Sequence, residues 1–409
     1  MATRDARCPP VSLMPLANDP AASVRFYRVQ PLPPNHPQPC FPTLPVVGAA
    51  GRSVEHFTSA SRFLAPDALL TPSGKVATYW ALKAGGVRPG DRVAVSAYHC
   101  PTMIFPVIAL GATPVFLPVT ARGQVGLEGV NAALALGVRA VVVPHLFGFP
   151  TPQMLEIQQR CRAQSVVLIE DCAHALYARA GTALPGSFGD YAIASTRKFI
   201  PGGEGGALVA NGLALEHPRR TAGLYAELRG LHTLWHDAYR YGTQRWHGRR
   251  ASTLIGPADD EASQQEARPA RASAEDLDNA RVERLALKSV QWLVRHADHD
   301  RIASVRRQRF RRWAQALAGL SQVEAYAPEL APDHVPYVFP LRLQRPAAQF
   351  NALKYHGVAV WRWDQLAESA CPMSAKLALE LIQLPCQHSL SDTAFERLVS
   401  LCLRALATA

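Results

Sequence analysis

Between residues 74 and 171 the chain alternates between two hydrophobic patterns. Short continuous apolar runs rich in β-branched residues are typical of strands buried on both faces of a parallel sheet. Longer segments with apolar residues every three or four positions are typical of amphipathic helices. This alternation predicts a mostly parallel sheet with helices on both faces. The expected helices are 74–86, 101–111, 126–137 and 152–164, and the expected strands are 92–97, 113–119, 140–147 and 165–171.

Candidate chemistry lies at the end of the last of these strands. Asp171 closes the run 165–171, and Lys198 follows a second buried run, 191–195, by three residues. Ligands of open α/β sheets bind outside the carboxyl ends of the strands. A lysine amine can bond to the aldehyde of pyridoxal phosphate, and a carboxylate can keep its pyridine nitrogen protonated. Either residue alone is more often a turn former or a surface charge, so the pair carries the prediction.

The motifs around this pair are EDCAHA, GSFGD and RKFIPGGEGGALV, with SGKVATYWAL, GVRPGDRV, LGATPVF and HLFGFP upstream and LPCQHSLSD downstream. In order and spacing they resemble the DegT/DnrJ/StrS family of pyridoxal-phosphate-dependent sugar aminotransferases. The resemblance covers most of residues 70–210 and is thin beyond residue 215. It implies an α/β, aspartate-aminotransferase-like (fold type I) architecture with a smaller C-terminal α/β domain. It also implies that Lys198 is the catalytic lysine and that Asp171 pairs with the pyridine nitrogen.

Other residues are expected to bind the cofactor on the same grounds. Ser73 and Gly74 open a helix whose free N–H groups suit a phosphate, although a plain serine N-cap explains them equally well. Lys75 stands where the family has threonine. His174 occupies the family position near the cofactor's phenolic oxygen. A hydroxyl of Ser195 or Thr196, which precede Lys198, is expected near the phosphate.

The family places an aromatic side chain over the pyridine ring, in the segment SAYHCPTM of this chain. Stacking on a flat cofactor fixes its tilt. The usual position falls on Cys100, so Tyr98 or His99 is predicted as the stacking partner. Core packing is a competing interpretation for Tyr98.

The domain organisation is predicted from composition. Residues 1–50 are rich in proline and form an N-terminal arm, residues 51–290 a large cofactor-binding domain, and residues 291–409 a small domain. Residues 246–275 are polar and predict a flexible insertion. In the small domain 337–343 and 358–363 are expected strands, and Ser391 is expected to cap the last helix. Trp361, Arg362 and Trp363 could contact substrate or serve core and ion-pair roles.

Composition narrows the function classes. The 409 residues carry a net charge of +11 and eight scattered cysteines, with no metal-ligand spacing. We expect no metal site, reduced thiols, and Cys172 as a small buried residue. Much of the positive charge lies at 245–250 and 305–312, where a solvated basic helix face is favoured over nucleic-acid binding. No apolar run approaches the ~20 residues of a membrane span, and a cytoplasmic location is expected.

The resemblance implies an aminotransferase that moves an amino group, from glutamate by analogy, to a keto group of a nucleotide-linked sugar, for cell-surface polysaccharide or secondary-metabolite biosynthesis. Its expected partners are these small molecules and a second copy of the chain in a homodimer. A sugar dehydratase of the same fold is one alternative, in which histidine replaces the lysine, so Lys198 argues against it. A catalytically silent binding or regulatory relative is another, because the family's glycine–asparagine–tyrosine–arginine segment is not found.

Overall fold

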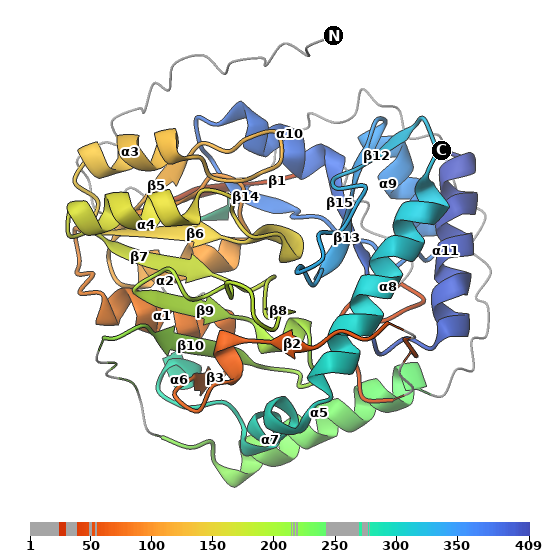
Figure 1. Cartoon of the computed structure of the whole chain (residues 1–409), viewed down its shortest axis with the longest axis horizontal. Coiled ribbons are helices and arrows are strands. Elements are labelled where there is room, and N and C mark those ends of the chain that lie inside the picture. Colours follow the sequence, from red (N-terminus) through yellow and green to blue (C-terminus); the bar gives the residue numbers. More distant parts are fainter. Residues whose placement is uncertain are drawn as a thin grey trace.

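The computed structural model of the protein describes residues 24–29, 39–48, 51–53, 55–213, 215, 217, 220–242, 270–271, 277 and 279–409. Most of the predicted arm and nearly all of the predicted insertion lie outside these residues. A large sheet with its helices and a smaller C-terminal group of strands and helices lie side by side (Figure 1). The predicted boundary at residue 290 falls inside a helix, Lys288–His296, and the division into domains stays a prediction.

The large sheet has seven strands, of which only one runs against the others. Its order confirms the predicted mostly parallel α/β architecture, since the expected strands 92–97, 113–119, 140–147 and 165–171 all lie in it. The antiparallel strand is β10. In spatial order the strands are β3 (Leu69–Thr71), β10 (Gly206–Ala210), β9 (Tyr191–Ala194), β7 (Val167–Asp171), β6 (Ala140–Pro144), β4 (Arg92–Ser96) and β5 (Thr113–Leu117).

Helices cover both faces of this sheet because its strands are apolar on both sides. Val93 and Val95 face α1 (Gly74–Ala84) and α2 (Phe105–Ala109), whereas Ala94 between them faces the opposite core. That opposite core contains α3 (Leu127–Ala135) and α4 (Met154–Ala163). The alternation along one strand therefore builds a three-layer α/β/α unit (Figure 1).

The predicted helix 101–111 is interrupted. Proline has no N–H to donate, and its ring clashes with the preceding turn inside a helix. Pro101 begins a short 3₁₀ helix, Pro101–Met103, and Pro106 lies in the first turn of the five-residue helix α2. One amphipathic pattern thus yields two short helical pieces.

The C-terminal part is built on a three-stranded antiparallel sheet in the order β12-β13-β15, with helices packed around it (Figure 1). The strand predicted at 337–343 is confirmed, whereas 358–363 forms only an isolated bridge, Trp361 to Gln383. Ser391 caps the last helix as predicted, since its hydroxyl accepts the N–H of Ala394 at 3.2 Å. The strands are β12 (Val323–Ala325), β13 (Val338–Leu343) and β15 (Leu381–Pro385), and the helices α8 (His299–Leu317), α9 (Pro346–Tyr355), α10 (Pro372–Glu380) and α11 (Asp392–Ala407).

Short elements complete the described chain. A second three-stranded sheet joins β1 (Arg25–Arg28) to β14 (Gln365–Ala367) and β11 (Ala270–Arg271), and β2 (Ser59–Ala60) pairs with β8 (Ala178–Arg179). The remaining helices are α5 (Leu224–Gly242), α6 (Asn279–Val282) and α7 (Lys288–His296). Among the described residues no helix is long and apolar enough to cross a membrane.

The basic helix α8 corrects an expectation. The arginines of 305–312 are predicted to form a solvated face, and Arg311 and Arg312 do lie at the surface. Arg306, Arg307 and Arg309, however, are at most 3% exposed. Burial is tolerated because each guanidinium donates to backbone carbonyls, and Arg307 also pairs with Glu55 at 3.0 Å. These arginines therefore attach α8 to the segments that pack around it. The predicted cluster at 245–250 lies outside the described residues.

Candidate active site

A cavity of about 470 Å³ lies where the large sheet meets the C-terminal part. One side is formed by residues at the carboxyl ends of sheet strands and at the start of α1, which we call the strand-end wall: Ser73, Gly74, Lys75, Asp171, His174, Ser195 and Lys198. The other side comes from the C-terminal part, and we call it the aromatic wall: Tyr337, Trp361, Trp363 and Gln383. Seven of the ten site residues predicted from the sequence therefore line one cavity.

Asp171 and Lys198, the central pair, are brought into this cavity by adjacent parallel strands. Asp171 ends β7, next to β9, and the turn after β9 is the 3₁₀ helix η4 (Thr196–Lys198). Asp171 Oδ1 accepts the N–H of Ala173 at 2.9 Å, and no other hydrogen bond to its carboxylate occurs within the described ranges. Burial raises the pKa of Asp171, while the Ala173 N–H and the charge of Lys198 act in the opposite direction.

Lys198 has no hydrogen-bond acceptor for Nζ among the described residues; Nζ lies 5.5 Å from the centre of the Tyr337 ring. Burial lowers the pKa of Lys198 below its ordinary value, and the nearby Cys100 and Asp171 partly counter that effect. The backbone carbonyl of Lys198 accepts a hydrogen bond from the buried Arg306 at 2.7 Å. The structure therefore fixes the lysine backbone and leaves its amine available for chemistry, with a raised neutral fraction at neutral pH.

His174 is held as a neutral imidazole with a defined tautomer. Its Nδ1 accepts the N–H of Phe147 at 3.2 Å, so in the neutral ring the proton is on Nε2. Burial, reinforced by the positive charge of Lys198, lowers its pKa well below the usual value. The ring stacks on Tyr337 at 4.5 Å. His174 can thus donate a hydrogen bond into the cavity, as a partner of a phenolic oxygen must.

The segment that orients His174 contains a non-glycine residue in the left-handed region. Phe147, in the motif HLFGFP, has φ 61°, a conformation that disfavours bulky residues and is often found at functional sites. Its N–H binds His174, and its carbonyl accepts the N–H of Tyr337 at 2.8 Å. The neighbouring Gly148 has φ +99°, and a Cβ there would lie 2.5 Å from the carbonyl oxygen of Val335. This motif therefore connects the two walls of the cavity.

At the start of α1 the backbone of Ser73 and Gly74 lies so close to β10 that Gly206 of that strand has no room for a side chain. Ser73 caps the helix, with its hydroxyl accepting the N–H of Val76 at 3.3 Å. On β10 a Cβ at Gly206 would lie 2.3 Å from the carbonyl carbon of Ser73 and 2.5 Å from the nitrogen of Gly74. The glycine-rich run before β10 thus positions the first turn of α1 against the sheet. The N-cap interpretation of Ser73 is confirmed. Its role at a phosphate stays a prediction, with which a capped helix start is compatible because it still has free N–H groups.

Ser195 and Thr196 differ in where they lie. Ser195 lines the cavity, whereas Thr196 does not. Thr196 is 1% exposed, and its hydroxyl has no hydrogen-bond partner in the described part of the chain. Gly205 lies directly against it, since a Cβ there would be 2.4 Å from Oγ1.

Tyr98 and His99, the predicted stacking partners, are not brought to the cavity. His99 is fully buried, stacks on Phe116 at 5.7 Å, and its Nε2 accepts the N–H of Ala367 at 3.4 Å. Tyr98 is also fully buried, with its ring 4.3 Å from that of Trp363. Cys100 lines the cavity at this point. The core-packing interpretation of Tyr98 therefore agrees with its surroundings.

The aromatic wall was largely missed by sequence reasoning. In the extended segment around residue 362, Trp361 and Trp363 face the cavity, while Arg362 between them points to the core and pairs with Asp364 at 3.2 Å. Alternate residues of an extended segment face opposite sides, so the Trp-Arg-Trp order in the sequence could have indicated that both tryptophans face the same way. Tyr337 and Gln383 carry no local motif, and only the antiparallel pairing of β13 with β15 brings their segments together.

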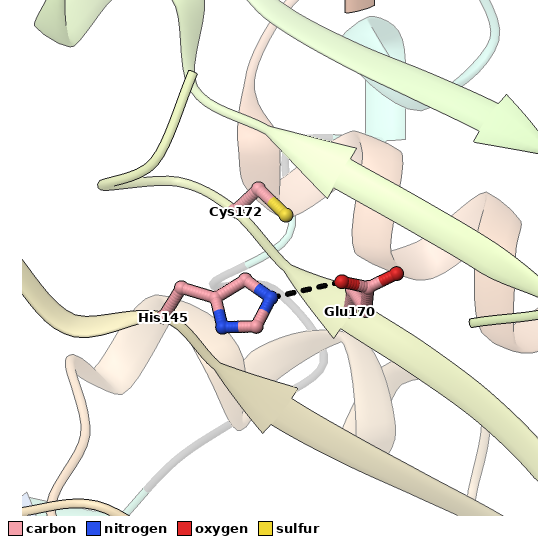
Figure 2. A group of neighbouring side chains, drawn as sticks. All are labelled: His145, Glu170 and Cys172. Carbon is pink, nitrogen blue, oxygen red and sulfur yellow. Dashed lines mark hydrogen bonds and ion pairs between the residues drawn. The ribbon is translucent and has the colours of Figure 1, made fainter. Parts of the chain in front are cut away.

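A group of possible metal ligands consists of His145, Glu170 and Cys172 (Figure 2). The ligand atoms of His145 and Glu170 already have partners. His145 Nε2 and a Glu170 oxygen are 2.9 Å apart, His145 Nδ1 accepts the N–H of Thr151, and Glu170 accepts three further backbone N–H groups. Cys172 is fully buried, as predicted. The group therefore serves to fix the ends of β6 and β7, and with them the position of Asp171.

The strand-end wall fits pyridoxal phosphate. Lys198 supplies a free amine, Asp171 a carboxylate without a cationic hydrogen-bond partner, and His174 a donor for a phenolic oxygen. The start of α1 offers N–H groups for a phosphate, with Lys75 and Ser195 beside them.

Residues 49–237 match the model of the DegT/DnrJ/EryC1/StrS aminotransferase family. A GDP-perosamine synthase of Vibrio cholerae is 30% identical over 205 residues, which are 48% of this chain and 54% of that protein; the chain thus matches about half of this relative's length. A UDP-N-acetyl-3-dehydro-α-D-glucosamine 3-aminotransferase of Acidithiobacillus ferrooxidans is 25% identical over 381 residues, 88% of this chain and 90% of that protein.

The fold is shared with solved aminotransferases. NtdA from Bacillus subtilis, solved with its bound cofactor PMP, aligns over 83% of this chain and 73% of that one, with a TM-score of 0.53 and 17% identity. Aminotransferases of the matched family depend on pyridoxal phosphate, in agreement with the fit described above. The chain has the fold type I architecture of these enzymes, and its residues 49–237 resemble the DegT/DnrJ/EryC1/StrS aminotransferase family.

Proposed function

We propose that the protein is a pyridoxal-phosphate-dependent aminotransferase that moves an amino group from glutamate to a keto group of a nucleotide-linked sugar. The observation that carries this proposal is the convergence of Lys198, Asp171 and His174 in one cavity. When bound, pyridoxal phosphate supplies an aldehyde that bonds to amines and a ring that accepts an electron pair from the substrate carbon.

Each of the three residues has a separate task. Lys198 Nζ, whose pKa is lowered by burial, would take the proton from the α-carbon of the donor and later deliver a proton to the acceptor carbon. The carboxylate of Asp171 holds a proton on the pyridine nitrogen, which keeps the ring electron-poor. His174 donates from Nε2 and does not compete for protons, because its pKa lies well below the usual range.

Support for the sugar substrate comes from the relatives. The names of both curated relatives refer to sugars that carry a nucleotide. The cavity adds basic side chains, Lys75, Arg197 and Arg281, which suit the phosphates of such substrates as well as that of the cofactor. A sugar dehydratase of this fold is disfavoured by Lys198, and a catalytically silent protein is disfavoured by the retained pair. The homodimer and the cytoplasmic location stay predictions.

The test is a single-turnover reaction of the protein reconstituted with pyridoxal phosphate. Adding L-glutamate should release about one equivalent of 2-oxoglutarate per cofactor, and Lys198→Ala should release none. Lys83→Ala is the matched control, since Lys83 is an exposed residue in the last turn of α1, outside the cavity wall. If the wild-type protein binds the cofactor but releases no keto acid from glutamate, glutamine, aspartate or alanine, the proposal is wrong.

A further inference from the structure

Gln383, on the aromatic wall, is a buried amide without a partner. The residue is 0% exposed, and neither Oε1 nor Nε2 has a hydrogen-bond partner among the described residues. Buried amides almost always find partners, since an unmet donor or acceptor costs free energy. An exception that faces a cavity is therefore a position where a ligand can supply the missing bonds.

Other buried glutamines show that the C-terminal part can satisfy such side chains. Gln349, also 0% exposed, donates from Nε2 to the Gln322 carbonyl at 3.0 Å and accepts the Arg345 N–H at 2.8 Å. Gln387 donates to the Pro42 carbonyl and accepts from Ser389. Both lie outside the cavity wall. Gln383 differs from them in position, because it lines the cavity.

The backbone of Gln383 is rigid. It lies on β15 opposite Pro340 of β13, and on its other side its N–H donates to the carbonyl of Trp361 at 2.8 Å. The backbone of Gln383 is thus paired on both sides, and the paired residue Trp361 lines the same cavity. A fixed polar group beside an aromatic surface is preorganised for recognition.

The chemistry of the amide restricts what it can recognise. A carboxamide offers two donors and an acceptor. A carboxylate or phosphate would accept from Nε2 but would leave Oε1 facing negative charge. A hydroxyl or an N-acyl amide both donates and accepts, and so satisfies both ends. The basic residues Lys75, Arg197 and Arg281 belong to other segments of the cavity wall. The anionic part of a substrate would therefore bind at those residues, and a neutral part at Gln383.

We propose that Gln383 determines specificity for the sugar: it hydrogen-bonds a neutral substituent of the sugar ring, a hydroxyl or an N-acyl group, beside the Trp361 and Trp363 side chains. This inference rests on the proposed function and adds the site that reads the sugar. The strand-end wall then holds the cofactor, and the aromatic wall holds the part of the substrate that distinguishes one sugar from another.

The experiment measures binding to the holoenzyme by calorimetry for matched probes: UDP, UDP-glucose and UDP-N-acetylglucosamine, then GDP with GDP-mannose and dTDP with dTDP-glucose. The sugar advantage is the Kd of the bare nucleotide divided by that of its sugar form. At least one pair should show an advantage in the wild-type protein, and Gln383→Leu should reduce it about tenfold while the Kd of the bare nucleotide stays the same. A loss confined to UDP-N-acetylglucosamine identifies an N-acyl group, and one shared with UDP-glucose a hydroxyl.

Gln349→Leu is the matched control. It removes a paired amide of equal burial outside the cavity, so it should lower the melting temperature and leave the sugar advantage unchanged. Gln383→Leu removes an unpaired amide and should not lower the melting temperature. An unchanged sugar advantage in Gln383→Leu, no sugar advantage in the wild-type protein, or a lower melting temperature for Gln383→Leu would each overturn the inference.

The same samples separate this inference from the proposed function. In our proposal, cofactor binding and keto-acid release from glutamate depend on Lys198 and not on Gln383. If they fail in the wild-type protein, the aminotransferase proposal fails. If they succeed and the sugar advantage does not depend on Gln383, only the specificity inference fails.

Discussion

The two walls of the cavity are built in different ways. The strand-end wall consists of residues that follow strands of one sheet or open one helix, and its shape comes from backbone packing at glycines such as Gly206. The aromatic wall joins Tyr337, which directly precedes β13, with the extended segment around Trp361 and with Gln383 of β15. In our proposal the first wall holds the cofactor and the second recognises the sugar. Catalysis and specificity would then lie in separate parts of the chain.

The largest effect should come from the strand-end wall. Asp171→Asn keeps the shape but loses the negative charge that stabilises a protonated pyridine nitrogen, so kcat for glutamate should fall by about 10²- to 10³-fold. Asp190→Asn is the control, because Asp190 accepts the N–H of Leu168 at 2.8 Å outside the cavity. Stopped-flow measurement of keto-acid formation distinguishes them. Equal rates in Asp171→Asn and wild type would remove Asp171 from the chemistry.

Next in size is the connection between the walls. Arg306, fully buried, donates to the carbonyls of Lys198 at 2.7 Å and Tyr337 at 2.8 Å. Arg306→Lys loses the planar fork and leaves a carbonyl unpaired, so the free energy of unfolding should fall by about 3 kcal/mol. Arg312→Lys, in an exposed pair with Glu396, should cost less than about 1 kcal/mol. Urea denaturation measures both, and similar small losses would show that Arg306 does not hold the walls together.

A third prediction concerns the HLFGFP motif. Gly148→Ala puts a Cβ 2.5 Å from the Val335 carbonyl oxygen, at φ +99°. Gly137→Ala has a comparable φ of +71° with nothing within 4 Å. Both variants carry backbone strain of ~1–2 kcal/mol, but only Gly148→Ala should add a further ~1–3 kcal/mol and weaken substrate binding. Equal losses in thermal unfolding would mean that the close contact at Val335 is unimportant.

The prediction with the smallest effect at neutral pH is a pH dependence of stability. Burial lowers the pKa of His99 to about 4, while the unfolded chain binds its proton near 6.5. The unfolded state therefore holds more protons between pH 6.5 and 4, and His99 should reduce the free energy of unfolding by up to about 1.4 kcal/mol per pH unit as the pH falls through this window. His99→Gln should flatten the profile, whereas His232→Gln on the exposed surface of α5 should not. An identical slope in His99→Gln would contradict this assignment.

The strand-end wall could be predicted because its information is local. Asp171 and Lys198 follow recognisable strands, and the order of parallel strands places their carboxyl ends at one edge. The buried arginines of α8 could not be predicted, since a basic helix face gives no sign of the carbonyls that later surround it. Only tertiary contacts decide between a solvated and a buried guanidinium.

The aromatic wall shows a second limit. Trp361 and Trp363 were noted as a cluster, but the choice between core and site depended on the pairing of Trp361 with Gln383, which is distant in the sequence. The segment 358–363 has the composition of a strand but forms only a bridge to the free edge of β15. No sequence motif marks Gln383, because what distinguishes it is that its buried side-chain amide has no hydrogen-bond partner among the described residues.

The central claim is that Lys198 holds pyridoxal phosphate in the cavity. The most direct test is the visible absorption spectrum of the purified protein with the cofactor, compared with that of Lys198→Ala, before and after addition of glutamate. The account predicts a band that differs from free cofactor, requires Lys198 and fades with glutamate. Identical spectra for wild type, Lys198→Ala and free cofactor would contradict it.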